Sequence, residues 1–175
     1  MARRDERLAL SSLARGMEGL SPTKGRELAE AARVCLHHGR HRSGVSLSVT
    51  GHWHTSRALV FEEPSVQALR THADLQEATE SGACALAIVV ARDETGLEVV
   101  ERARKGTGVD YWLGRVVGVF EARLEVSGIL EGGDVHVARR AQQKLEQMKR
   151  SDDDDIPGYA AVVEFSGPRV HVEHK

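Results

Sequence analysis

The clearest pattern of hydrophobic and polar positions lies in the second half of the chain. From Phe120 to Ser127 the two kinds of residue alternate strictly, which places them on opposite faces of a β-strand. Two earlier stretches, residues 97–104 and 109–113, show the same period of two, and a glycine-containing turn separates them. The pattern therefore predicts three consecutive strands.

Helical spacing of hydrophobic residues occurs on both sides of these strands. Ser21 and Pro22 form a helix start signal, and the spacing that follows predicts a helix ending near Gly39. A second helix is predicted over residues 132–150, with one apolar stripe. The nearly continuous apolar run 159–165 is typical of a central strand covered on both faces, and a last alternating strand follows it.

A hairpin and an ambiguous apolar run lie between the first helix and the three strands. Residues 44–61 predict a two-stranded hairpin around a central glycine. Residues 83–91 are apolar and partly β-branched, so periodicity does not separate a buried helix from a buried strand. We expect a helix, because residues 76–80 are helical in composition. Residues 1–20 carry only a weak helical pattern, and we expect an N-terminal arm followed by a single α/β domain over residues 21–175.

Composition excludes several classes of protein. The chain has 175 residues, 24 basic and 26 acidic side chains and a net charge of -2, which argues against a protein that binds nucleic acid merely by being basic. Cys35 and Cys84 are far apart, which argues against a disulfide framework and a thiolate zinc site. No apolar run approaches the roughly 20 residues that span a bilayer. We expect a cytoplasmic protein without membrane contact.

Two acidic residues occupy notable positions in the predicted strands. Asp110 stands between a glycine-rich turn and two aromatic residues, although aspartate is disfavoured inside strands. Glu125 lies on the next strand. If the two strands pair, these carboxylates can approach on one face and offer the hard oxygen ligands that Mg²⁺ or Mn²⁺ prefers. The alternative is that Asp110 caps the turn and Glu125 faces solvent.

The order helix, three strands, helix, strand, with an acid on the second strand and a Glu-x-Lys-like tripeptide on the third, resembles the core of the PD-(D/E)XK restriction-endonuclease-like nucleases. The resemblance covers roughly residues 70–165. It implies an α/β restriction-endonuclease-like core, extended at the N-terminus by a helix and a β-hairpin. It also implies that Asp110 and Glu125 bind Mg²⁺ or Mn²⁺, with Glu80 or Glu77 as a further ligand. In such enzymes the metal positions a water for attack on a phosphodiester, and the lysine of the motif orients or activates that water.

The chain departs from this motif at two positions. Val109 replaces the proline, which is a common variation, and Ser127 replaces the lysine. Serine supplies no positive charge, so a cation from elsewhere must act if the site cleaves. The candidates are Lys105, Arg123 and Lys144. Arg123 is the best placed by period, and its guanidinium would act electrostatically.

Basic and histidine-rich stretches suggest further contacts. Residues 105–108 are interpreted as a hairpin turn and not as a phosphate cradle, because they lack the Walker pattern and lead into a strand. The residues expected to contact a nucleic-acid backbone are Lys105, Arg104 and Lys144. Residues 37–42 form a locally basic patch. His52 and His54 offer half of a metal site, but no cysteine or carboxylate completes a recognised spacing.

Three functions are consistent with these patterns. The first is a metal-dependent phosphodiesterase, a nuclease or nuclease relative in DNA processing or defence, which acts on nucleic acid and could work as a homodimer. The second is a catalytically inactive nuclease-fold protein that binds a protein partner in a defence or toxin-immunity assembly, which Ser127 and the near-neutral charge favour. The third is a histidine-built metal enzyme. Resemblance of fold alone does not decide between them.

Overall fold

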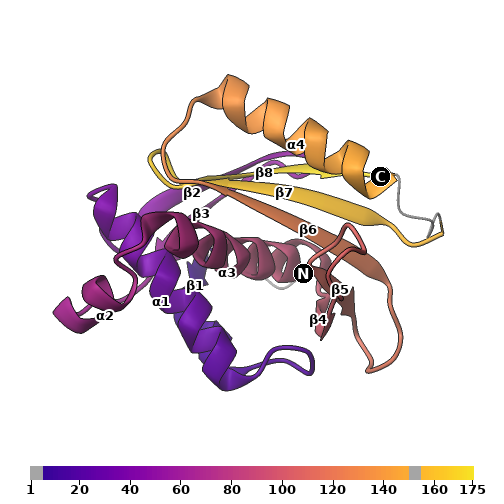
Figure 1. The fold of residues 1–175 in the computed structure, drawn as a ribbon, viewed down its shortest axis with the longest axis horizontal. Coiled ribbons are helices and arrows are strands. Elements are labelled where there is room, and N and C mark those ends of the chain that lie inside the picture. The colour runs from indigo at the N-terminus through magenta and orange to yellow at the C-terminus, as the bar shows by residue number, and fades with distance from the viewer. Residues whose placement is uncertain (1–5, 150–154) are drawn as a thin grey trace.

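The structure is a computed structural model and describes residues 6–149 and 155–175. Within these residues, eight strands form one mixed sheet in the order β1-β3-β2-β8-β7-β6-β5-β4, and five helices accompany it (Figure 1). The strands are β1 (Arg7–Ala9), β2 (Val45–Gly51), β3 (Thr55–Val60), β4 (Glu98–Arg102), β5 (Tyr111–Gly114), β6 (Ala122–Ile129), β7 (Gly158–Glu164) and β8 (Arg169–His174). The helices are the 3-10 helix η1 (Leu10–Arg15), α1 (Pro22–His38), α2 (Val66–Thr71), α3 (Leu75–Thr95) and α4 (Asp134–Lys149). The expected α/β class is confirmed.

The helices cover both faces of the sheet (Figure 1). α1 and α3 pack together on one face, and α4 lies on the other against β6, β7 and β8. The residues that α4 buries are Val137, Ala141, Leu145 and Met148. Ala138 of the same helix is exposed. None of the helices in the described ranges is both long and apolar enough to cross a membrane.

The three strands predicted from their period of two are β4, β5 and β6. They form an antiparallel meander, and β6 then pairs in parallel with β7 after the chain has passed through α4. A parallel pair needs such a crossover, because the chain must return to the end of the sheet from which it started. The predicted order of helix, three strands, helix and strand is thus confirmed in α3, β4, β5, β6, α4 and β7.

Residues 83–91 belong to α3, so the helix expected there is confirmed. Asp74 caps the start of α3 with its side chain, and Gly96 ends it with a φ of 73°. Periodicity was uninformative because nearly every residue of this run is buried, between the sheet and α1. Gly82 allows α1 to come close, since a Cβ there would lie 2.8 Å from the Ala32 Cα.

The segment before α1 is part of the sheet and not a separate arm. β1 pairs in parallel with β3 at one edge, and the Gly19 N–H donates to the Val99 carbonyl of β4, at the other edge, over 2.9 Å. The buried leucines of the segment are Leu8, Leu10, Leu13 and Leu20. Burying these side chains favours a packed segment, and their weak helical spacing did not indicate the surfaces on which they pack. The arm predicted over residues 1–20 is therefore wrong for residues 7–20.

Candidate active site

Asp110 lies at the point where β5 stops pairing with β6. The register of these strands ends with Tyr111 opposite Leu124, whereas β6 continues along β7 to Ile129. The Asp110 N–H donates to the Leu124 carbonyl over 2.9 Å, and Asp110 Oδ2 accepts from the Val126 N–H over 2.8 Å. An aspartate is suited to this position because its carboxylate replaces the strand partner that β5 no longer provides.

Glu125 points to the face of β6 that α4 covers, and it lines the same cavity as Asp110. Glu125 Oε1 accepts from Lys144 Nζ of α4 over 2.8 Å. Asp110 Oδ1 accepts from Arg102 Nη1 of β4 over 3.0 Å. Each carboxylate of the pair therefore has one cation beside it. Glu125 is 7% exposed, so its charge lies largely out of reach of solvent screening.

The electrostatic balance of the pair favours protonation of Glu125. Burial, the charge of Asp110 and a hydrogen bond with it together raise the pKa of Glu125 to about 7, against the opposing effect of Lys144. Two carboxylates that share a site cannot both ionise cheaply. Arg102 and Lys144 match the two carboxylates charge for charge, yet the pKa of Glu125 remains raised. Perturbed carboxylates of this kind occur in functional sites as well as in some structural networks.

The carboxylate pair opens into a cavity of about 480 Å³ that we call the acid-pair cavity. Residues from α1, α3, β4, β5, β6 and α4 line it. Its charged lining residues are Lys24, Glu80, Arg102, Asp110, Glu125, Arg140 and Lys144. The structure therefore brings four of the residues predicted from the sequence into one cavity. These four are Glu80, Asp110, Glu125 and Lys144.

α4 places its two cations on β6 with matching spacing. Lys144 contacts Glu125, and Arg140 Nη1 donates to Ser127 Oγ over 3.2 Å. One helical turn rises roughly 6 Å over four residues, and two residues of a strand span roughly 6.6 Å, so the two pairs stay in register. Ser127, which stands where the motif has lysine, thus has a cation beside it from α4.

Other predicted residues lie outside this lining. Arg123 is 1% exposed, and its N–H donates to the Pro157 carbonyl over 2.8 Å, near the start of β6. The period of two predicted its face correctly but not its distance from the cavity. Arg104 and Lys105 are exposed in the β4–β5 turn. Lys144, one of the three candidates for the missing lysine, donates a hydrogen bond to the acid pair.

Glu80 does not complete a ligand set in the described residues. Among these, no group of three or more His, Cys, Asp or Glu side chains is arranged to hold a metal ion. α3 is nevertheless held close to β6 beside Glu80, because Gly128 has no side chain, and a Cβ there would lie 2.6 Å from the Thr79 carbonyl oxygen. Glu80 itself is exposed on α3 at the rim of the acid-pair cavity, and the three-carboxylate shell stays a prediction.

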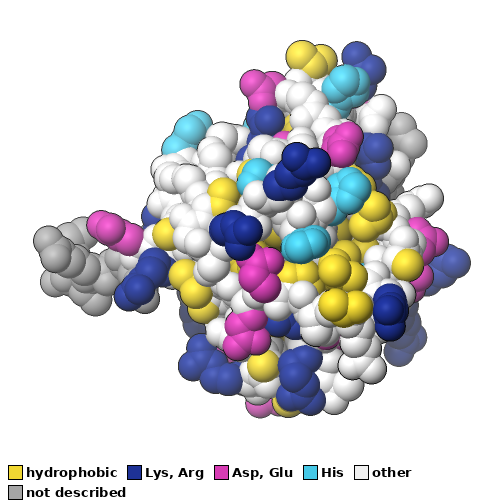
Figure 2. Space-filling view, turned by 90° about the vertical axis from the view of Figure 1, so that its left-hand side faces the viewer, with side chains coloured by type: hydrophobic (Ala, Val, Ile, Leu, Met, Phe, Trp, Pro, Cys, Tyr) yellow, Lys and Arg dark blue, Asp and Glu magenta, His cyan; other side chains and the backbone are white. Residues whose placement is uncertain are grey.

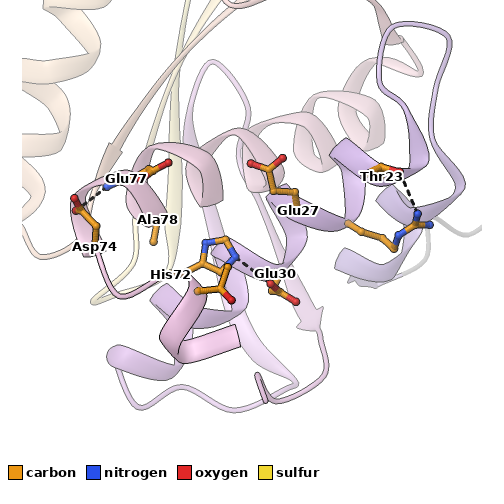
Figure 3. A pocket seen from close by; sticks show the side chains of 9 residues that line it. Thr23, Glu27, Glu30, His72, Asp74, Glu77 and Ala78 are labelled. Carbon is orange, nitrogen blue, oxygen red and sulfur yellow. Dashed lines mark hydrogen bonds and ion pairs between the residues drawn. The ribbon is translucent and has the colours of Figure 1, made fainter. Parts of the chain in front are cut away.

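A second cavity, of about 500 Å³, lies between α1, α2 and α3 and is strongly acidic (Figure 3). Its acids are Glu27, Glu30, Asp74 and Glu77. Two of them have evident structural partners, since Glu30 contacts His72 Nε2 over 3.1 Å and Asp74 caps α3. This cavity thus contains helix-end and inter-helix contacts.

The histidines are distributed over contacts of their own. His52 stacks on His174 with ring centroids 4.4 Å apart. Within the described ranges, neither histidine belongs to a group of three or more His, Cys, Asp or Glu side chains that could hold a metal ion. Figure 2 shows histidines among lysines and arginines on one side of the molecule. In the basic patch 37–42, His37 lies 3.4 Å from a Glu63 oxygen and His38 lies 3.5 Å from a Glu131 oxygen. Acids therefore face this patch.

The acid pair fits a hard divalent cation that takes few protein ligands. Mg²⁺ is commonly held by one or two carboxylates and keeps waters or substrate oxygens in its remaining positions. A dication between Asp110 and Glu125 would relieve the repulsion that raises the Glu125 pKa. Comparison with family models, curated proteins and solved structures finds no match. Function must therefore be inferred from the geometry of this cavity.

Proposed function

We propose that the protein is a metal-dependent phosphodiesterase, a nuclease in DNA processing or defence. The observation that carries the proposal is that Asp110 and Glu125 line one cavity where the β5–β6 pairing ends, with Lys144 on Glu125. The order of elements around it is helix, three strands, helix and strand, as the resemblance to restriction-endonuclease-like nucleases implies, and this order supports the same function. Fold resemblance adds only an analogy, so the chemistry rests on the side chains.

Asp110 and Glu125 would hold Mg²⁺ or Mn²⁺. A cation bound there supplies a positioned water and neutralises charge that develops on the phosphate. Lys144 has the place and the charge to take over the role of the motif's lysine. Its ammonium group remains beside Glu125 and points into the same cavity, where it can orient the water or contact the phosphate. Arg140 adds a second positive charge over Ser127.

Cleavage assays on plasmid and on single-stranded DNA test this proposal. Wild-type protein with Mg²⁺ or Mn²⁺ should cleave at least one of them, and Asp110→Asn should lower the rate by about 100-fold or more. Glu146→Gln, an exposed acid on α4, serves as the matched control and should leave the rate unchanged. Cleavage that persists in a folded Asp110→Asn protein would contradict the assignment.

A nuclease-like fold used only for interaction is the second candidate. It is favoured by the observation that Arg102 and Lys144 already neutralise Asp110 and Glu125, and by Ser127 in the motif. This candidate predicts a folded protein that neither binds Mn²⁺ nor cleaves DNA. Such a result would direct the search to a protein partner.

A further inference from the structure

The acid-pair cavity has cations on both sides of the sheet. Arg140 and Lys144 come from α4, and Lys24 comes from α1 on the opposite face. Arg102 belongs to the α1 side, since its guanidinium lies 4.6 Å from the centre of the Tyr111 ring and Tyr111 packs in the core on that side. The carboxylates therefore lie between two pairs of cations, and not beside a single basic patch.

The α1-side cations converge on one point near Asp110. Burial and the charge of Asp110 raise the pKa of the Cys84 thiol to about 11, against the opposing charges of Arg102 and Lys24. Lys24 of α1, Arg102 of β4 and Asp110 before β5 also line the cavity together with Cys84. Lys24 thus reaches the cavity from a helix that lies outside the nuclease-like core.

The partners of Lys24 and Arg140 leave both cations able to bind an anion. Lys24 pairs with Glu27 one turn along α1, but the two side chains are about half exposed, and such pairs contribute little. Arg140 contacts a neutral hydroxyl, that of Ser127. A phosphate would therefore replace a weak contact at each position.

The charges of the lining suit a polyanion. Four cations and three carboxylates line the cavity, so a divalent cation on the acid pair would leave a clear positive excess. One phosphodiester carries a single negative charge and would neutralise only part of this excess. A continuous backbone supplies one further charge at each neighbouring nucleotide.

We propose that the acid-pair cavity binds a nucleic-acid backbone that crosses the edge of β6 from one face of the sheet to the other. Lys24 and Arg102 bind the phosphate on the α1 side of the scissile bond, and Arg140 binds the phosphate on the α4 side. The cleavage part of this arrangement rests on the proposed function, whereas the binding part does not require hydrolysis.

The test is fluorescence anisotropy with labelled 20-nucleotide strands of DNA and of RNA, in Ca²⁺. Lys24→Gln and Arg140→Gln should each weaken binding by about 5- to 10-fold. Each should also reduce the slope of log affinity against log salt concentration by the amount that corresponds to about one phosphate contact. Arg26→Gln on α1 and Arg139→Gln on α4 are matched controls, since both residues are exposed and neither lines this cavity. These controls should change affinity by less than about 2-fold. Tighter binding of one of the two strands would identify whether the backbone is DNA or RNA.

Two results would overturn the inference. If Lys24→Gln bound the strand as tightly as the wild type, the strand would be confined to the α4 side. If the two control variants lost as much affinity as Lys24→Gln and Arg140→Gln, the loss would reflect the total charge of the protein and not this cavity. Cleavage by the same wild-type sample in Mg²⁺ separates this inference from the proposed function. If the wild type cleaves but binding does not depend on Lys24, only the inference is overturned. If binding depends on Lys24 and Arg140 but the wild type does not cleave, only the hydrolytic function is overturned.

Discussion

Glu125 and Glu164 are buried carboxylates on the neighbouring strands β6 and β7, and their surroundings differ completely. Glu164 is 0% exposed, and it accepts hydrogen bonds from the Ser166 N–H over 2.7 Å, from the Ser166 hydroxyl and from the Gly167 N–H over 3.0 Å. Arg169 Nε lies 3.5 Å from its Oε2. Glu125 instead has Lys144 on one side and a second carboxylate on the other.

This difference separates a structural acid from a candidate catalytic one. Burying a charge costs free energy unless donors compensate it, and the tight turn after β7 provides donors to both oxygens of Glu164. At Glu125 the fold keeps a second carboxylate, that of Asp110, close enough to repel the Glu125 charge. An apolar residue in place of Glu125 would remove this repulsion. Such a conflict is expected where the site is completed by a ligand.

The largest expected effect is a difference between Lys144, the cation beside Glu125, and Arg169, the cation beside Glu164. Lys144→Met should lower cleavage by about 100-fold, because it removes positive charge from the reacting phosphate, while the protein stays folded. Arg169→Met, at the turn that holds Glu164, should lower the free energy of unfolding and leave the rate constant of the folded protein unchanged. Single-turnover cleavage and urea denaturation of both variants provide the measurement. Comparable cleavage by Lys144→Met and wild type would refute the role given to Lys144.

Glu164→Gln should destabilise the protein by about 1–3 kcal/mol, because an amide replaces charge-assisted hydrogen bonds and turns an NH₂ group toward one of the backbone donors. Cleavage at a temperature where the variant is folded should match the wild type. The free energy of unfolding from urea titration is the readout. A fully stable Glu164→Gln protein would remove the contrast with Glu125.

Glu125→Gln should change how stability depends on pH. The folded pKa of about 7 lies above the unfolded value of 4.5, so the folded state holds the extra proton between these pH values. Stability of the wild type should therefore fall as pH rises through this window, by on the order of 1–2 kcal/mol after allowance for solvent screening. Glu125→Gln lacks this term. The difference in unfolding free energy between variant and wild type should thus grow from pH 5 to pH 8, and a constant difference would contradict the raised pKa.

The smallest expected effect concerns the lysine outside the cavity. Lys105 is exposed in the β4–β5 turn, so Lys105→Gln should reduce cleavage by less than about 3-fold. Measurement beside Lys144→Met at one salt concentration gives the comparison. A loss as large as that of Lys144→Met would transfer the role of the missing lysine to the turn.

Local signals in the sequence were sufficient for the strands and for the acid pair. The strict alternation from Phe120 to Ser127 predicted β6. An aspartate at the start of a strand marked Asp110, because the residue type opposes the local structure. Both signals lie within a few residues, which is the range that pattern analysis reads.

Contacts between distant segments were not predictable in the same way. Lys24 lies roughly 100 residues from Glu125 in the chain, and only the packing of α1 on α3 brings it to the cavity. Arg140 could have been suspected from its spacing of four residues from Lys144, but its partner depends on the register between α4 and β6. The position of Arg123 was not predictable for the same reason, since the period of a strand shows a face and not a position along it.

Calorimetry with Mn²⁺ is the most direct test of the central claim that Asp110 and Glu125 form a metal site. Wild-type protein should bind Mn²⁺, and a variant carrying both Asp110→Asn and Glu125→Gln should not, while Glu164→Gln should bind as the wild type does. No binding by the wild type, or equal binding by the double variant, would contradict the claim.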